Sequence, residues 1–276
     1  MDKVRIFLVR HGESQGNVDK SLHKIMPDHE IALTTDGMGQ AQEAGQKLKD
    51  YLKKHQPAVA VDLGGMFGGL ISNLAKQKGI KDTDLAKTNE LLQRYQQSKA
   101  RLWYSPYRRT RETARIISGV ANKFISDARE HILLCEQQFG LFDGLTEDES
   151  NEKFPEEYKS FQHAKKYNGK FWARFPMGES PFDAACRIHQ AFGTFKRDEE
   201  DKNINDIIVI CHGAISKLFT MMWLHKSPEW FQAEPTCGNC GIRLIEDHED
   251  KGYIFGGYAK GNEWNYDGNK YDRTGS

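Results

Sequence analysis

Residues 6–12 of the chain read Ile-Phe-Leu-Val-Arg-His-Gly, and residues 207–213 read Ile-Ile-Val-Ile-Cys-His-Gly. Each stretch begins with an unbroken apolar run and ends in a His-Gly pair. An unbroken run, rather than an alternating one, is typical of a strand buried on both faces of a parallel sheet. We therefore expect two central strands, each followed directly by a histidine.

Helical patterns lie between the two predicted strands. Apolar residues recur at helical spacing in residues 35–54, 108–121 and 180–195. Strands that alternate with helices favour an α/β fold with helices on both faces of the sheet. The predicted architecture is a three-layer α/β/α sandwich around a mostly parallel central sheet.

Two segments do not follow this alternation. Residues 57–100 contain a glycine-rich stretch that lacks the Lys-Ser/Thr ending of a P-loop, followed by a polar helical pattern. We expect them to form a helical insertion. The length of 276 residues allows one large or two small domains. We predict a single domain over residues 1–258 and a flexible C-terminal tail over residues 259–276, which are rich in Gly, Asn, Asp and Tyr.

The charge balance limits the class of partner. The chain has 39 Lys and Arg against 39 Asp and Glu, so its formal net charge is zero. This balance argues against nucleic acid and anionic membrane surfaces as partners. No apolar run approaches the roughly 20 residues of a membrane span, and the first run is too short for a signal peptide. We therefore predict a cytoplasmic protein without a membrane span.

The five cysteines are expected to be reduced thiols, because an odd number without a secretory signal disfavours a disulfide framework. Cys237 and Cys240 form one CxxC pair. A zinc site needs about four ligands. His225 and His248 could complete one, but no second CxxC or HxxxH follows. Ordinary loop cysteines and no bound metal are the expectation.

The two His-Gly pairs predict a shared site. Ligands of open α/β sheets bind beyond the carboxyl ends of the strands, which is where His11 and His212 are expected. Gly12 and Gly213 would remove side chains that block a sharp turn or the close approach of a ligand.

A third segment, residues 105–114, reads Ser-Pro-Tyr-Arg-Arg-Thr-Arg-Glu-Thr-Ala. We expect Ser105 to cap a helix and Pro106 to occupy its first turn. A helix N-terminus attracts anions. Ser105, Arg109 and Thr113 would share one face of that helix.

Together these segments resemble the histidine phosphatase superfamily, which includes the cofactor-dependent phosphoglycerate mutases. The opening motif of that family, Arg-His-Gly-Glu followed by Ser or Thr and an Asn, stands here at residues 10–14 with Asn17. The other motifs follow in family order. A Ser-Pro-x-x-Arg pattern ends on Arg109, and the acid Glu136 stands before an aromatic-Gly pair. Gly178-Glu179-Ser180 with Arg187 comes next, and His212-Gly213 comes last.

The resemblance implies a set of roles that agrees with the chemistry of phosphoryl transfer. His11 would attack phosphorus with an unprotonated ring nitrogen and form a phosphohistidine. Glu136 would donate a proton to the leaving group, with a pKa raised by the neighbouring phosphate. The arginine forks suit phosphate, and no metal or cofactor is needed. The residues predicted to bind the phosphoryl group or the rest of the substrate are Arg10, Ser14, Asn17, Arg109, Arg174, His212 and Gly213.

Two further segments point to a branch of the family. Residues 171–180 are similar to a stretch in the bisphosphatase half of the fructose-2,6-bisphosphate enzymes, which makes Arg174 a candidate for holding a second anionic group. Residues 18–37 resemble a broad-range acid phosphatase branch of fungi and plants, with His23, Lys24 and His29 as candidates for the pocket rim.

We therefore predict a metal-independent phosphatase that hydrolyses small phosphomonoesters. One alternative is a cofactor-dependent phosphoglycerate mutase, although only Lys165-Lys166 offers the additional basic residues such an enzyme uses. A second alternative is a non-catalytic phospho-ligand binder or scaffold on the same fold. The sequence makes no prediction of oligomeric state.

Overall fold

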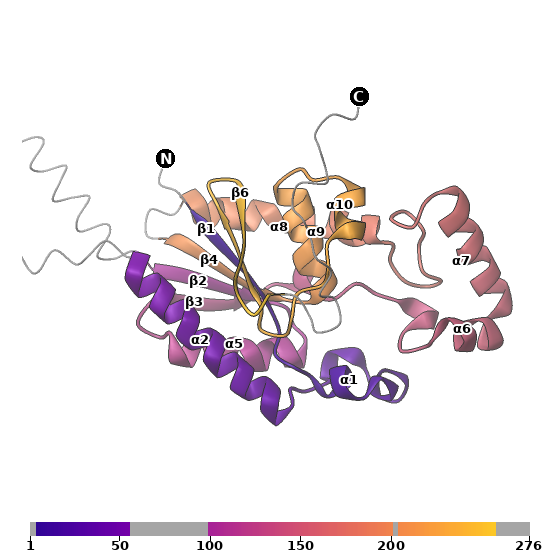
Figure 1. The fold of residues 1–276 in the computed structure, drawn as a ribbon, viewed down its shortest axis with the longest axis horizontal. Coiled ribbons are helices and arrows are strands. Elements are labelled where there is room, and N and C mark those ends of the chain that lie inside the picture. Colours follow the sequence, from indigo (N-terminus) through magenta and orange to yellow (C-terminus); the bar gives the residue numbers. More distant parts are fainter. Residues whose placement is uncertain (1–3, 56–98, 201–203, 258–276) are drawn as a thin grey trace, which may run out of the picture.

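The computed structural model describes residues 4–55, 99–200 and 204–257. A six-stranded sheet forms its centre, in the order β3-β2-β4-β1-β5-β6 (Figure 1). The strands are β1 (Arg5–Arg10), β2 (Lys99–Tyr104), β3 (Ile125–Glu130), β4 (Ile204–Cys211), β5 (Ile242–Glu246) and β6 (Glu249–Phe255).

Strands β1 to β4 pair with one another in parallel. Strand β5 pairs antiparallel with β1, and β6 pairs antiparallel with β5. The predicted mostly parallel sheet is therefore confirmed. Strands β1 and β4 are neighbours, and their register places Arg10 opposite Cys211. Both strands consequently end at the same edge of the sheet, which sets the position of the residues that follow them.

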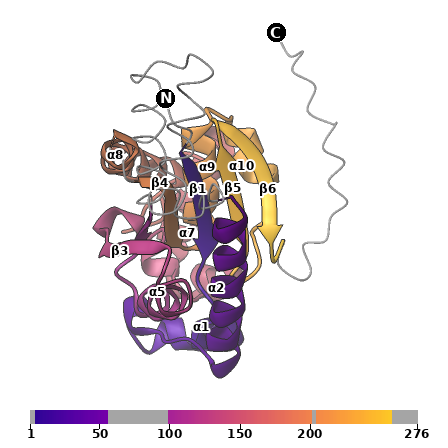
Figure 2. The ribbon, with the colours of Figure 1, turned by 90° about the vertical axis from the view of Figure 1, so that its left-hand side faces the viewer.

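Helices cover both faces of the sheet, as the alternating pattern predicts. Helices α2 (Thr35–His55) and α5 (Arg108–Val120) lie on one face, and α8 (Pro181–Glu200) and α9 (Gly213–Trp223) lie on the other (Figures 1 and 2). Successive side chains of β1 point to opposite faces. Phe7 and Val9 therefore pack into the core beneath α2 and α5, whereas Ile6 and Leu8 pack into the core beneath α8 and α9.

A smaller lobe projects beyond the carboxyl ends of the strands (Figure 1). It contains α6 (Glu147–Lys153) and α7 (Pro155–Tyr167). The ring of Phe142, which is 8 % exposed, contacts the rings of Phe154, Tyr158, Phe161 and Phe175 and joins this lobe to the main body. The remaining short elements are α1 (Gln15–Val18), η1 (Lys20–Lys24), η2 (Asp28–Glu30), η3 (Ile132–Leu134), η4 (Gly140–Phe142) and α10 (Pro228–Ala233).

The boundary of the predicted insertion is wrong at its C-terminal end. Lys99 and Ala100 belong to β2, and Ala100 is buried and pairs with Ile125 of β3. The polar pattern before this strand concealed its start. The rest of the predicted insertion, and the predicted tail over residues 259–276, lie outside the described residues.

Candidate active site

The structure brings His11 and His212 together at the carboxyl ends of β1 and β4. The backbone N–H of His11 donates a hydrogen bond of 3.0 Å to the carbonyl of Cys211, which continues the strand pairing. The two imidazole rings meet edge to face, with their centroids 5.3 Å apart. Both side chains are buried.

The ring of His11 is held through one nitrogen. Its Nδ1 lies 2.7 Å from the carbonyl oxygen of Gly12, so Nδ1 carries the hydrogen and Nε2 keeps its lone pair. Burial, reinforced by the charges of Arg109 and Arg10, lowers the pKa of His11 well below its usual value. The ring is therefore neutral and presents an unprotonated nitrogen.

The ring of His212 is held through its other nitrogen. Its Nε2 lies 2.8 Å from Oγ of Ser105, and the backbone N–H of Tyr107 donates to the same hydroxyl oxygen over 3.5 Å. The Ser105 hydroxyl can then donate to Nε2, which leaves the hydrogen on Nδ1. That Nδ1 is buried and has no hydrogen-bond partner within the described part of the chain.

This arrangement corrects the predicted role of Ser105. Helix α5 begins at Arg108 with Tyr107 as its N-cap residue, so Ser105 lies between β2 and the helix and does not cap it. The fully buried hydroxyl contacts His212 because β2 and β4 are adjacent, and the backbone N–H of Ser105 donates to the carbonyl of Ile210.

The two predicted phosphate-binding arginines have different partners. Nη1 of Arg10 donates to the carbonyl of Cys237 over 2.7 Å, and its buried Nε has no partner in the described residues. The guanidinium of Arg109 instead forms a two-pronged pair with Asp28, through Nη1 to Oδ1 at 2.9 Å and Nη2 to Oδ2 at 3.0 Å. Nη1 also donates to the Asp28 carbonyl over 2.7 Å.

Sequence reasoning did not include Asp28 among the site residues. Burial alone would raise the pKa of Asp28, but the contact with His23 and the hydrogen bonds from Arg109 outweigh it and lower the pKa to about 2. The available signal was Pro27-Asp28 in the segment that resembles the acid phosphatase branch. Its pairing with Arg109 depends on a contact across 81 positions of the chain.

Glu136 is a second carboxyl near these groups, with a different electrostatic environment. Shielding from solvent by the surrounding protein raises its pKa to about 7, against the opposing charges of Arg109 and Arg10. The dominant cause is therefore burial, which acts without the bound phosphate that the sequence argument invoked.

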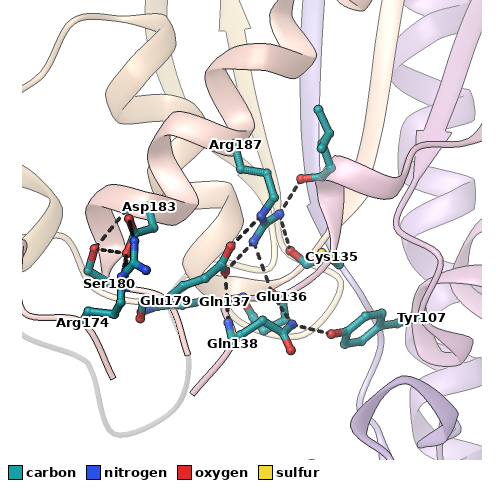
Figure 3. Close-up of polar contacts among 11 residues, drawn as sticks. Tyr107, Cys135, Glu136, Gln137, Gln138, Arg174, Glu179, Ser180, Asp183 and Arg187 are labelled. Carbon is teal, nitrogen blue, oxygen red and sulfur yellow. Dashed lines mark hydrogen bonds and ion pairs between the residues drawn. The ribbon is translucent and has the colours of Figure 1, made fainter. Parts of the chain in front are cut away.

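The backbone around Glu136 is held by Arg187 (Figure 3). Nη1 of Arg187 donates to the carbonyls of Leu133 and Cys135 over 2.6 and 3.0 Å. Its Nε and Nη2 form a two-pronged pair with the carboxylate of Glu179, at 2.9 Å each. The Gly-Glu-Ser motif and Arg187 together thus fix the loop that carries Glu136.

Asn17 and Ser14 lie where α1 follows the first His-Gly pair. Oδ1 of Asn17 accepts from the backbone N–H of Ser14 at 3.1 Å and from Nδ2 of Asn239 at 3.0 Å. The amide of Asn17 is thereby oriented with its NH₂ group free of these contacts. Asn239, which also donates to the carbonyl of His11 over 3.2 Å, was missed by sequence reasoning because it lies 222 positions from Asn17.

The two glycines allow close packing of neighbouring segments. A Cβ on Gly12 would lie 2.4 Å from the carbonyl oxygen of Gly37 in α2, a distance that rigid backbone cannot accept. A Cβ on Gly213 would lie 2.7 Å from a methyl group of Thr236. The steric need at Gly12 therefore comes from helix α2 rather than from a ligand.

Comparison with known proteins assigns this set of residues to a family. The family model described as the histidine phosphatase superfamily (branch 1) matches residues 6–60 and 77–255. The chain belongs to this superfamily.

Curated proteins and solved structures are similar over most of the chain. The phosphoglycerate mutase-like protein AT74H of Arabidopsis thaliana is 27 % identical over 260 residues, covering 91 % of this chain and 76 % of the relative. The broad-range acid phosphatase DET1 of Saccharomyces cerevisiae is 26 % identical over 296 residues, covering 87 % and 84 %. The solved α-ribazole phosphatase of Shigella flexneri shares the fold at a TM-score of 0.59 and 16 % identity, covering 90 % of this chain and 93 % of that one.

In this histidine phosphatase, the structure does not bring Arg174 to the other predicted residues. Its side chain is 67 % exposed and forms a two-pronged pair with Asp183, through Nε to Oδ2 at 2.9 Å and Nη2 to Oδ1 at 2.5 Å (Figure 3). Asp183 is in turn held by Ser180 at the start of α8. The ion pair directs Arg174 away from the loop of Glu136.

A cavity of about 1480 Å³ lies between the ends of the strands and the smaller lobe. Arg10 and Asn17 line it from the main body, and Phe142, Tyr158 and Phe161 line it with aromatic side chains. Of the predicted rim residues, His23 and Lys24 line the cavity, whereas His29 is 61 % exposed. The cavity is large enough for a phosphoester with a bulky leaving group.

The remaining sequence features have plain structural roles. Cys237 and Cys240 are buried, and the backbone N–H of Cys240 donates to the carbonyl of Arg10. Within residues 4–55, 99–200 and 204–257, no group of three or more His, Cys, Asp or Glu side chains could hold a metal ion. None of the helices described in those ranges has the length and apolar character needed to cross a membrane.

Proposed function

We propose that this histidine phosphatase hydrolyses phosphomonoesters without a metal, through a phosphohistidine on His11. One observation carries the proposal. The ring of His11 is neutral and pinned through Nδ1 to Gly12, so its Nε2 lone pair is available beside two arginines. Such a nitrogen is a competent nucleophile toward phosphorus.

In the first step, Nε2 of His11 attacks phosphorus and the bond from phosphorus to the ester oxygen breaks. The transferring group carries charge on its oxygens, which positive donors stabilise. Arg10, Arg109 and the Nδ1–H of His212 would supply these donors. Glu136 would give its proton to the departing oxygen, which leaves as an alcohol.

In the second step, the ionised Glu136 takes a proton from water. The resulting nucleophile attacks the phosphohistidine, the bond from nitrogen to phosphorus breaks, and inorganic phosphate leaves. His11 and protonated Glu136 are restored. A pKa of about 7 suits this double role, because both protonation states of Glu136 are accessible near neutral pH.

The names of one relative and of one solved structure agree with this reaction class. One is called a broad-range acid phosphatase, and a solved structure that shares the fold is called a glucosyl-3-phosphoglycerate phosphatase. We extend hydrolysis of phosphomonoesters to this chain as a proposal. The small phosphorylated substrate would occupy the cavity beside Arg10 and Asn17.

The test is a panel of phosphorylated metabolites scored by phosphate release, combined with acid-quenched mass spectrometry of the protein. We expect release from several substrates and a phosphoryl group on His11. Isomerisation of 3-phosphoglycerate with a bisphosphoglycerate primer would favour the mutase instead. Tight phosphate binding without turnover of any substrate would favour a non-catalytic binder.

A further inference from the structure

Asp28 contacts Arg109 in the way that a phosphoryl group would. Its two carboxylate oxygens meet the two terminal amino groups of Arg109 at 2.9 and 3.0 Å. This two-pronged geometry is the one by which arginine recognises both carboxylates and phosphates. A carboxylate and a phosphoryl group cannot occupy the same two donors at once.

The other proposed phosphate donors are not covered in this way. Nε of Arg10 and Nδ1 of His212 are buried and have no partner in the described residues. Arg109 is therefore the donor of the set that already holds an anionic group.

The charge of Asp28 also reaches the reacting groups. The negative charge of Asp28 acts to raise the pKa of both His11 and Glu136, although burial is the largest cause of each shift. With a pKa of about 2, Asp28 stays ionised across the working range of pH. It therefore repels an incoming phosphoryl dianion as well as competing with it for Arg109.

A second partner is available to the Asp28 carboxylate. Nδ1 of His23 lies 3.1 Å from Oδ1 of Asp28. This contact raises the pKa of His23, because it outweighs the opposing effect of burying the imidazole. Lys24, next in the chain, pairs with Glu149 of α6 at 2.6 Å and ties this segment to the smaller lobe. The carboxylate can thus turn from Arg109 toward His23 without losing all its contacts.

We propose that Asp28 is an intramolecular competitor for the phosphate-binding fork of Arg109. A substrate phosphoryl group takes the fork, and the carboxylate moves onto His23. Asp28 then weakens the binding of both substrate and inorganic phosphate, which speeds release of the product. This inference rests on the proposed phosphate site, but only on phosphate binding and not on turnover.

The test compares Asp28→Asn with the matched control Glu30→Gln, which removes one negative charge from the same short helix η2 at a side chain that is 59 % exposed. The dissociation constant of inorganic phosphate is measured by isothermal titration calorimetry on the full chain. We expect Asp28→Asn to bind phosphate about tenfold more tightly, because the fork of Arg109 no longer holds a competing carboxylate. Glu30→Gln should change binding by less than about twofold.

The same measurement in an Arg109 variant tests whether Asp28 weakens phosphate binding through Arg109. In an Arg109→Gln background, Asp28→Asn should have much less effect on phosphate affinity, because the contested fork is gone. Weaker or unchanged phosphate binding in the single Asp28→Asn variant would overturn the proposal and assign Asp28 a positioning role. If Asp28→Asn does not fold, Asp28→Ser, which keeps the carbonyl contact to Arg109, takes its place.

Failure of the proposed function gives a different result. A protein that hydrolyses nothing in the panel, yet binds phosphate more tightly when Asp28 is replaced, contradicts the proposed hydrolysis and supports the competitor role. A protein that hydrolyses phosphoesters but shows no tightening contradicts only the competitor role.

Discussion

The two His-Gly pairs have the same sequence and follow adjacent parallel strands, yet their imidazole rings are held through opposite nitrogens. His11 donates from Nδ1 to its own neighbour Gly12, which leaves a lone pair on Nε2. His212 is held at Nε2 by Ser105, which follows β2, and the Ser105 hydroxyl can donate to Nε2 and leave the hydrogen on Nδ1. In the proposed mechanism His11 would attack and His212 would donate, and the difference between the two rings lies in their neighbours.

The largest expected effect follows from replacing His11. His11→Ala removes the proposed nucleophile, so we expect the turnover of an aryl phosphate to fall by at least about 10⁴-fold. Steady-state assays of kcat and KM measure this loss, and mass spectrometry should find no phosphorylated protein after acid quench. A variant that keeps substantial turnover would contradict the assignment of His11.

Replacing His212 should cost less, because it removes one donor to the transferring group and leaves the nucleophile. We expect His212→Ala to lower kcat by about 10²- to 10³-fold, as for loss of one donor in a preorganised anion site. The phosphohistidine should still form, more slowly, in rapid-quench experiments. If both alanine variants were equally inactive and neither formed a phosphorylated protein, this result would contradict the proposed difference in role between His11 and His212.

The pH profile should report Glu136 rather than either histidine. Both histidines have pKa values lowered well below the usual value, first by burial, and stay neutral. Because the donor acts when protonated, kcat/KM should be level on the acid side and fall as pH rises through about 7.

Glu136→Gln should abolish the fall in kcat/KM above pH about 7. It should also lower turnover of an alkyl phosphate by about 10²-fold. An activated aryl phosphate should lose less, because its leaving group needs no proton. A variant that keeps the full pH dependence would show that another group titrates.

A smaller effect is expected from Ser105, which orients His212 without reaching substrate. Ser105→Ala leaves Nε2 of His212 without its hydroxyl partner and frees the ring to adopt the other tautomer. We expect turnover to fall by about tenfold, which corresponds to one hydrogen bond. Ser105→Thr keeps a hydroxyl and should restore most of the activity, whereas a purely steric role would not be rescued in this way.

The smallest effect is expected from Arg174, which the structure places outside this arrangement. Its exposed pair with Asp183 should contribute little to stability or turnover. Arg174→Ala should therefore change kcat/KM by less than about twofold for a substrate with one phosphoryl group. A large rise in KM for a substrate with a second anionic group would restore the predicted binding role.

Much of the fold could be predicted because it depends on local patterns. The unbroken apolar runs identified β1 and β4, since burial on both faces of a sheet leaves no polar alternation. Helical spacing identified α2 and α5 for a similar reason. Strand β2 (Lys99–Tyr104) was not predicted, because a polar helical pattern precedes it and its first residues alternate between polar and apolar.

The residue types of the candidate site also came from the sequence, through strand ends and motifs. Strand ends predict His11 and His212, and the resemblance to the family motifs adds Arg10, Arg109 and Glu136. The order of motifs along the chain, however, carries no information about which nitrogen of each ring is free. That choice depends on the contacts of His11 with the carbonyl of Gly12 and of His212 with Ser105, which the folded chain sets.

Sequence alone thus determined which strands are central and which side chains follow them, because backbone pairing and burial leave a periodic signature. Only the tertiary structure decided what each side chain contacts. It paired Arg109 with Asp28, set His212 on Ser105 and placed Asn239 beside His11. These contacts join segments up to 228 positions apart, and their hydrogen bonds and charges act over a few ångströms that only the folded chain creates.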